Sequence, residues 1–318
     1  MANREQRRLI KFGNSSFIVA LPKEWIKRNK LKKGDLIHFS ENTNNELVLS
    51  SGEEKEKEIR SLIINVDDKD IKDLKREVNS AYINNYDEII LEGKKIGKRE
   101  EELLKSSIGI EVFEKSPQRI ILRDILDFEV ISIEKMLKRL DNTLRSMFED
   151  IKSGLKYKKL KDSILNEIIK SDEEVNKLYF LLLKIIRKCQ GNIKILKMLK
   201  TDSRKLSDLQ WIVLHMEYLG DELKRIARIL NSKKFALKDR ESIVMLISYL
   251  ERNYVETLSC YYSYDKKSAR RIAGAKENSL KLLEKNFRRS NSKELTIISE
   301  KMKWISLYIH NFAKIVAY

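Results

Sequence analysis

The side chains that most often carry catalysis are few and widely separated in this sequence. The three histidines are His38, His215 and His310, and the two cysteines are Cys189 and Cys260. None of them has a partner at the spacing of a metal site or of a nucleophile with its base. We therefore expect a protein that is not an enzyme and holds no cofactor, with a packing role for His215 and two reduced, buried cysteines.

Basic side chains are the stronger chemical signal, and they crowd the N-terminus. The net charge is +17, which favours polyanions as partners. Within residues 1–34 the cations are Arg4, Arg7, Arg8, Lys11, Lys23, Lys27, Arg28, Lys30, Lys32 and Lys33. The side chains of Asn14, Ser15 and Ser16 lie beside Lys11 and can bond to phosphates or base edges. The alternative is a solvated basic surface without a specific partner.

The elements that must position this basic set are short. Residues 7–12 and 16–21 are typical of two strands around a Gly-Asn-Ser turn, and a helix is expected to start after Pro22. A second hairpin should follow, with its Asn-rich turn at 42–45. A segment of this size buries little surface alone, so we expect an obligate dimer in which strands of two chains interleave.

Residues 55–126 alternate strand-like and helix-like segments, and the charged linker SGEEKEKE leads into them. This order predicts a small α/β connector domain of the ferredoxin-like type, with one of its helices over 98–109. Gly93 and Gly97 lack the spacing and the following Lys-Ser/Thr of a phosphate-binding loop. We interpret this domain as a spacer or a dimerisation unit.

Residues 128–318 predict an all-helical domain. Apolar residues recur at intervals of three and four, and the only prolines, Pro22 and Pro117, precede this region. Helices are expected over 129–153, 172–199, 205–231, 238–264, 266–289 and 292–317, with a short extra segment near 157–170. Similar stretches in the same order, such as VNKLYFLLLKIIRK and IAGAKENSLKLLEK, indicate tandem three-helix bundles over about 128–232 and 236–318.

Residues 5–50 resemble the swapped-hairpin domain of the AbrB/SpoVT and MazE type. The resemblance lies in the basic first strand, the Gly-Asn-Ser-Ser turn, the Val-Ala-Leu-Pro step into the helix, and the Lys-Gly-Asp turn before the second hairpin. Domains of this type are dimers that bind DNA through a basic face built from both chains. The resemblance thus implies a domain over 1–51 that binds double-stranded DNA. We expect it to contact DNA through Arg7, Arg8, Lys11, Asn14 and Ser15, with phosphate contacts from Lys23, Lys27 and Arg28.

The helical region resembles the PhoU phosphate-uptake regulators, in the archaeal form that carries this N-terminal domain. Residues 172–180, DEEVNKLYF, look like the start of that group's second helix, and residues 225–227, RIA, fall in its Glu-Arg-Ile-(Ala/Gly)-Asp motif. The acidic pair Asp221 and Glu222, just before this motif, is expected to be solvated helix surface.

The same resemblance implies carboxylates, four residues apart in each repeat, that ligate metal clusters. The corresponding positions here are Lys224 and Arg228 in the first repeat, and His310 and Lys314 in the second. Since cations do not ligate cations, we expect no metal at these positions. The set Lys224, Arg225 and Arg228 would instead suit inorganic phosphate or another anion, and the alternative is a solvated basic face.

Together these features predict a cytoplasmic DNA-binding transcription regulator, of phosphate uptake or phosphate homeostasis, whose helical domain senses an effector or binds a protein partner. The alternative is a PhoU-type adaptor that contacts a phosphate transporter or a signalling kinase and does not bind DNA. The N-terminus lacks the long apolar core of a signal peptide. No apolar run reaches the roughly 18–20 residues that span a bilayer, so we expect no membrane insertion.

Overall fold

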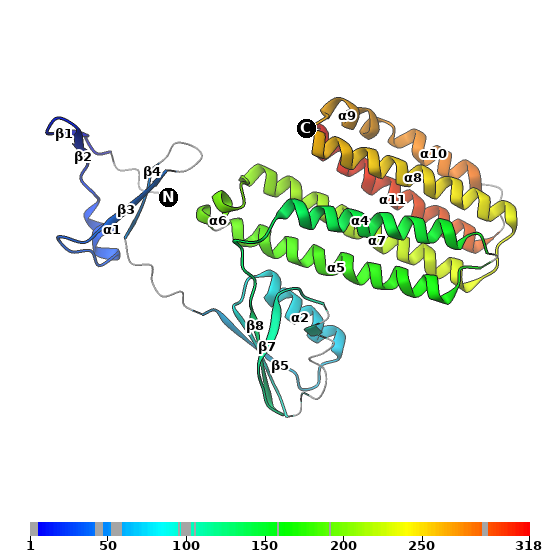
Figure 1. The fold of residues 1–318 in the computed structure, drawn as a ribbon, viewed down its shortest axis with the longest axis horizontal. Helices are drawn as coiled ribbons and strands as arrows, with labels where there is room; N and C mark the ends of the chain where they lie inside the picture. Colours follow the sequence, from blue (N-terminus) through cyan, green and yellow to red (C-terminus); the bar gives the residue numbers. More distant parts are fainter. Residues whose placement is uncertain are drawn as a thin grey trace. The chain divides into compact units, whose positions relative to one another are not determined.

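The structure is a computed structural model of the chain. It describes residues 6–41, 47–51, 59–94, 96, 103–104, 106–157, 159–190, 192–287 and 292–318. The chain divides into two compact units, the head (Met1–Glu58) and the body (Ile59–Tyr318), and each is considered by itself (Figure 1). The predicted fold class is confirmed, because a small β domain precedes an α/β module and an all-helical region.

The head contains two short hairpins and one short helix. Its elements are β1 (Ile10–Phe12), β2 (Ser16–Ile18), α1 (Lys23–Arg28), β3 (Ile37–Glu41) and β4 (Leu47–Ser51). Both hairpins, β1–β2 and β3–β4, are antiparallel, and α1 starts directly after Pro22 as predicted. Gly13 has a φ of 69° in the first turn, a left-handed conformation that suits glycine. The predicted turn at 42–45 lies outside the described residues.

The body begins with an α/β module. Its elements are β5 (Ser61–Asn65), α2 (Ile71–Ile83), β6 (Glu88–Glu92), β7 (Ile110–Lys115) and β8 (Arg119–Asp124). The strand order is β5-β6-β8-β7, with β5 parallel to β6 and the other pairs antiparallel. The ferredoxin-like prediction is therefore wrong, because that fold places another strand between the two strands that α2 would connect. Half of the predicted helix over 98–109 lies outside the described residues.

The rest of the body is helical. Its elements are α4 (Ile133–Gly154), α5 (Asp162–Gln190), α6 (Ile193–Met198), α7 (Ser203–Ser232), α8 (Leu237–Ser263), α9 (Lys266–Gly274), α10 (Lys276–Phe287) and α11 (Lys293–Ala317). The helix predicted over 172–199 begins earlier, at Asp162, so the extra segment near 157–170 belongs largely to α5. The helix predicted over 266–289 is interrupted at Ala275.

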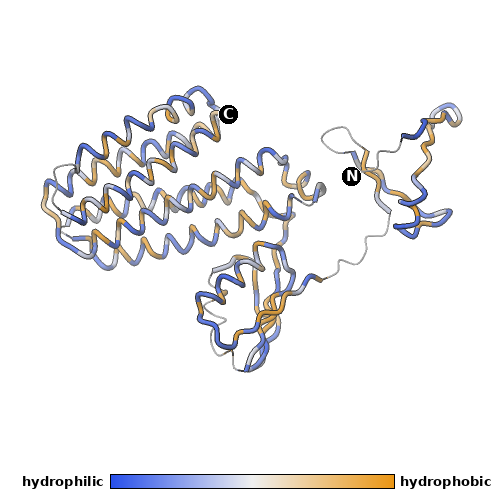
Figure 2. The backbone as a smooth tube through the Cα atoms, turned by 180° about the vertical axis from the view of Figure 1, so that it is seen from behind, coloured by the Kyte–Doolittle hydropathy of each residue, from blue (hydrophilic) through white to orange (hydrophobic). Residues whose placement is uncertain are grey.

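The helices form two sets of three in sequence order. One set consists of α4, α5 and α7, and the other of α8, the interrupted α9–α10 and α11 (Figure 1). Hydrophobic and hydrophilic residues alternate along each helix at helical spacing (Figure 2). Buried side chains of both sets, such as Leu144, Met216, Leu250 and Ile305, belong to one continuous core. The two predicted three-helix bundles therefore share one hydrophobic core and stabilise each other.

A buried ion pair joins the α/β module to the helices. The side chain of Lys184, on α5, is 0% exposed, and its Nζ lies 2.9 Å from Oδ2 of Asp124 at the end of β8. The same ammonium donates to the carbonyl oxygen of Tyr82 at 3.2 Å and lies 4.5 Å from the centre of that tyrosine ring. Phe180 of α5 also packs against the core of the module. The predicted connector domain is thus part of the same compact unit as the helices.

Candidate nucleic-acid interface and ion-pair network

The residues predicted to bind DNA lie in two groups on the head. Arg7 and Arg8 precede β1, Lys11 lies within it, and Asn14 and Ser15 form the turn to β2. The second group, Lys23, Lys27 and Arg28, lies on α1. All eight side chains are exposed. Lys27 and Glu24 form an ion pair of 3.9 Å between two well-exposed side chains, which contributes little and leaves Lys27 accessible.

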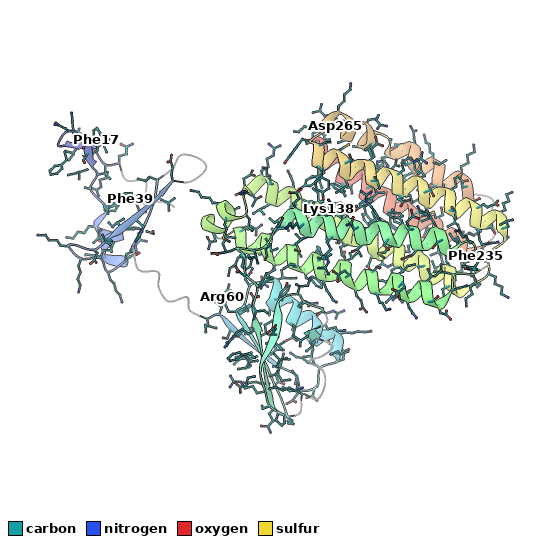
Figure 3. All side chains as sticks on the ribbon, in the orientation of Figure 1. Phe17, Phe39, Arg60, Lys138, Phe235 and Asp265 are labelled. Carbon is teal, nitrogen blue, oxygen red and sulfur yellow. The ribbon has the colours of Figure 1, made fainter. Side chains whose placement is uncertain are left out.

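The described residues of the head enclose no hydrophobic core. Among residues 6–39 and 47–51, every side chain is exposed or half-buried. Phe17 on β2 is 63% exposed and Phe39 on β3 is 60% exposed (Figure 3). Large exposed apolar surfaces commonly mark sites where another chain binds.

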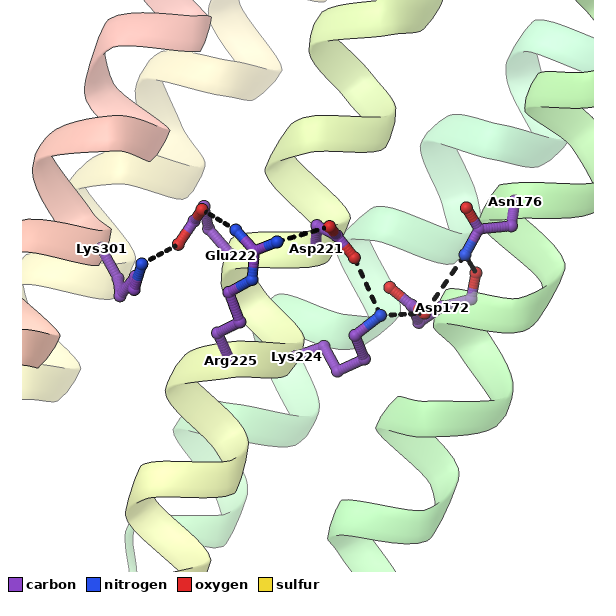
Figure 4. A network of polar contacts seen from close by, with 7 residues as sticks. All are labelled: Asp172, Asn176, Asp221, Glu222, Lys224, Arg225 and Lys301. Carbon is purple, nitrogen blue, oxygen red and sulfur yellow. Dashed lines mark hydrogen bonds and ion pairs between the residues drawn. The ribbon is translucent and has the colours of Figure 1, made fainter. Parts of the chain in front are cut away.

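In the body, two of the predicted anion-binding residues, Lys224 and Arg225, belong to an ion-pair network across α5, α7 and α11 (Figure 4). Lys224 Nζ lies 2.6 Å from Asp172 Oδ2 and 2.8 Å from Asp221 Oδ1. Arg225 pairs with Asp221 at 2.9 Å and with Glu222. Glu222 Oε2 in turn lies 3.3 Å from Lys301 Nζ on α11. The network alternates cations and carboxylates and is therefore largely neutral.

Burial in this network differs from what the sequence predicts. The Asp172 and Glu222 side chains are only 7% and 3% exposed, so the expectation that Asp221 and Glu222 form solvated surface is wrong for Glu222. Burial raises the pKa of Asp172, an effect that Lys224 partly offsets. A buried carboxylate must be paired to remain charged, and Lys224 provides that pair.

The predicted anion-binding set is only partly available to a ligand. Lys224 and Arg225 already bind carboxylates, so an anion would have to compete with Asp172 and Asp221, whereas Arg228 is exposed. His310 and Lys314 are not brought to this network. His310 is buried, and its Nδ1 lies 2.8 Å from the carbonyl oxygen of Ile272.

The residues at this place do not fit a metal ion. Lys224 places its own positive charge between the two carboxylates that would otherwise be ligands, and hydrogen-bonds to both. Its amine would have to lose a proton before it could donate electrons to a metal, while carboxylate pairing raises the pKa of Lys224. In the part of the chain that the structure describes, no group of three or more His, Cys, Asp or Glu side chains has metal-binding geometry.

Two further predictions concern the cysteines and His215. Cys189 and Cys260 are both free thiols and buried, as predicted, and burial raises the pKa of each thiol. His215 is half-buried, and its Nδ1 donates to the carbonyl oxygen of Trp211 at 2.6 Å. Its ring packs against those of Trp211 and Tyr308, so the packing role is confirmed.

Glu217 is a titratable group of this network that the sequence did not single out. It lies four residues before Asp221 on α7, so the two carboxylates share a face of the helix. Burial raises the pKa of Glu217 to about 7, and the charges of Asp221 and Asp172 raise it further, while Lys224 and Arg225 oppose them. The i, i+4 spacing of two acids was the sequence signal available for this site.

We expect Glu217→Gln to stabilise the body in a pH-dependent way. A folded-state pKa above the unfolded value means that Glu217 favours folding at low pH, and that this contribution is lost as pH rises through about 7. The variant should therefore be more stable than the wild type at pH 8, and should lose this advantage towards pH 5. Urea unfolding across this pH range measures the difference in unfolding free energy between the variant and the wild type. Glu173→Gln, at an exposed site on α5, is the control, and an equal pH response in both variants would contradict the assignment.

Comparison with known protein families finds one match that covers most of the head and another among the helices of the body. The family described as "Antidote-toxin recognition MazE, bacterial antitoxin" matches residues 10–60. The family described as "PhoU domain" matches residues 137–230, which span the set of α4, α5 and α7. The chain therefore combines a MazE-type N-terminal domain with a PhoU domain. Searches of curated proteins and of solved structures found no match to the chain.

Proposed function

We propose that this protein is a DNA-binding transcription regulator that works as a homodimer, with the head binding double-stranded DNA. One observation carries the proposal: a single small domain combines a wholly exposed basic set with uncovered apolar side chains. Exposed Lys and Arg side chains neutralise phosphates and release counterions. The MazE-type match to this domain supports the same assignment.

The homodimer is proposed because the head leaves its own apolar side chains in water. Phe12, Phe17, Leu36 and Phe39 are 64%, 63%, 77% and 60% exposed. Burial of apolar surface contributes roughly 25 cal/mol per Å², so interleaving the hairpins of two chains would supply the core that one chain lacks. Two-fold symmetry would then place two copies of the basic set in one assembly.

The body is proposed as the sensor or partner-binding domain, without enzymatic activity. The PhoU match supports a role in phosphate uptake or phosphate homeostasis, with inorganic phosphate or a protein as the bound effector. Within the described residues, no helix is long and apolar enough to cross a membrane, and we propose that the protein acts in the cytoplasm. A genome-wide binding map that recovers phosphate-transport genes would support this role, and one that recovers none would contradict it.

If the head binds DNA, its affinity for DNA should fall as salt rises, and it should depend on the basic side chains around β1. The triple variant Arg7→Ala, Arg8→Ala, Lys11→Ala should bind a short random-sequence duplex at least about 10-fold more weakly than the wild type. Because each phosphate contact contributes about 0.9 to the slope of log affinity against log salt, the slope should fall by about that amount per lost contact. Fluorescence anisotropy at several salt concentrations measures both quantities.

A matched control separates these contacts from the effect of net charge. Lys138, Lys267 and Lys281 are exposed lysines of the body, so replacing all three with alanine removes the same charge. This control should retain wild-type affinity. Equal losses in the two triple variants, or a wild-type affinity that does not change with salt, would refute DNA binding by the head and favour the PhoU-type adaptor.

A further inference from the structure

The body carries an exposed cluster of aromatic side chains on the seam between α7 and α11. Trp211, His215 and Tyr218 come from α7, and Trp304 and Tyr308 come from α11. Their ring centroids lie 6.4 Å apart for Trp211–His215, 6.1 Å for His215–Tyr308, 5.4 Å for Tyr218–Tyr308 and 6.1 Å for Trp304–Tyr308. The five rings thus form one continuous surface, which we call the aromatic band.

Much of the aromatic band is in contact with water. Trp211 is 57% exposed, Trp304 is 48% exposed and Tyr218 is 41% exposed. The chain contains three tryptophans, and two of them lie here. With about 200 Å² for a whole aromatic side chain, these three present roughly 300 Å² to solvent. A patch of that size on one protein commonly marks an interaction site.

The aromatic band also lacks charge. Residues 209–216 of α7 and 304–313 of α11 contain no Asp, Glu, Lys or Arg, although 36% of the chain is charged. Charged residues such as Glu217 and Lys303 border the band and do not interrupt it. Burial lowers the pKa of His215, which favours the uncharged form of its ring. Depletion of charge and enrichment of tryptophan and tyrosine are the features of the centre of a protein–protein interface.

The occupant that these observations favour is a second copy of the chain. Copies that each carry a net charge of +17 repel one another, so they can approach closely where the surface is uncharged. An uncharged aromatic surface is also complementary to itself, as a two-fold symmetric interface requires. Two facing bands would bury roughly 600 Å² from Trp211, Tyr218 and Trp304, about half of what a small stable interface needs. The residues around the bands would have to supply the rest.

We propose that the aromatic band is a self-association surface through which two bodies pair, independently of any contact between heads. Pairing would remove the exposed tryptophans from water, which is the main favourable contribution to such contacts. The contact needs neither DNA nor an effector, so it can be tested with the protein alone. It would give the chain two separate interfaces with itself.

Sedimentation equilibrium of four full-length proteins tests this proposal and separates it from pairing through the head. They are the wild type, a head variant (Phe17→Asp, Phe39→Asp), a band variant (Trp211→Ala, Trp304→Ala) and a variant with all four substitutions. The head variant should remain a dimer. Adding the band substitutions should raise the dissociation constant of that dimer at least about 30-fold, since truncation of buried interface tryptophans typically weakens binding by that much. The band variant should still dimerise through its heads.

Each other outcome has a definite meaning. A head variant that is monomeric at every concentration would overturn the band proposal and leave the head dimer in place. The head variant and the wild type could instead dimerise with equal dissociation constants, and the band substitutions could abolish dimerisation in both. That result would support the band proposal and refute the head dimer. Circular dichroism establishes that the variants keep their helices. Tyr264→Asn removes an aromatic side chain that is 74% exposed elsewhere on the body, and should leave self-association unchanged.

Tryptophan quenching gives a second readout that does not depend on substitutions in the band. In a Trp25→Phe protein the remaining fluorescence comes from Trp211 and Trp304. Quenching by acrylamide should fall at least about twofold between a dilute, dissociated sample and a concentrated, associated one. Quenching that is equal at both concentrations, in samples whose masses show association, would overturn the proposal.

Discussion

Lys184→Met is expected to lower the free energy of unfolding of the body by about 3–5 kcal/mol, because it removes one partner of a buried ion pair. The methionine keeps most of the aliphatic stem but leaves Asp124 without the ammonium that lies 2.9 Å from it. The carbonyl oxygen of Tyr82 loses a donor at the same time. A buried acceptor without a partner costs more than the lost bond itself contributed.

The junction between the α/β module and α5 should be affected first. Asn85 donates to the carbonyl oxygen of Lys184 at 3.1 Å, so the backbone of α5 is also held at this place. Urea unfolding of the full chain measures the loss. Adding Asp124→Asn should restore part of the stability, because it removes the uncompensated charge that Lys184→Met leaves behind.

A lysine on the same helix provides the control. Lys170 pairs with Glu167 at 2.8 Å, but their side chains are 69% and 63% exposed, so Lys170→Met should change stability by less than about 1 kcal/mol. If Lys184→Met and Lys170→Met had equal effects, the buried pair would not contribute to the stability of this junction.

Local patterns were sufficient to predict most elements of this fold. The periodicity of apolar residues predicted α4, α7, α8 and α11 within a few residues of their ends. The observed starts of three of them are fixed by capping side chains, because Ser132, Asp202 and Ser292 each accept a hydrogen bond from a backbone N–H in the first turn. The early start of α5 and the interruption at Ala275 were missed, because each depends on how that segment packs against distant helices.

The contacts that define the candidate sites could not be predicted in the same way. Lys184 meets Asp124 from a different element, and Lys224 meets Asp172 on another helix. Pairs of this kind depend on the tertiary arrangement, and the sequence shows only that each side chain is charged. The strand order of the α/β module was missed for a related reason, since the alternation of elements does not specify which strands become neighbours. By contrast, the exposed basic set of the head was predictable, because exposed polar residues depend little on packing.

Lys224→Met is expected to have the second large effect on stability, a loss of about 3 kcal/mol near neutral pH. Lys224 is only 15% exposed and pairs with both Asp172 and Asp221. Without it, these two carboxylates and Glu217 would repel one another in a partly buried place. Burial already raises the pKa of Asp172, and removal of its cation should raise it more.

This effect should depend on pH with a defined sign. A carboxyl group whose folded-state pKa is raised favours folding below its unfolded value and loses that contribution as pH rises. The loss of unfolding free energy caused by Lys224→Met should therefore grow between pH 5 and pH 8, as measured by urea unfolding. Adding Asp172→Asn to the same chain should remove much of this loss. Lys205→Met is the matched control on α7, because Lys205 and Asp202 form an exposed pair at 3.9 Å. A deficit that is the same at pH 5 and pH 8 would mean that Lys224 acts through packing and does not neutralise the carboxylates around it.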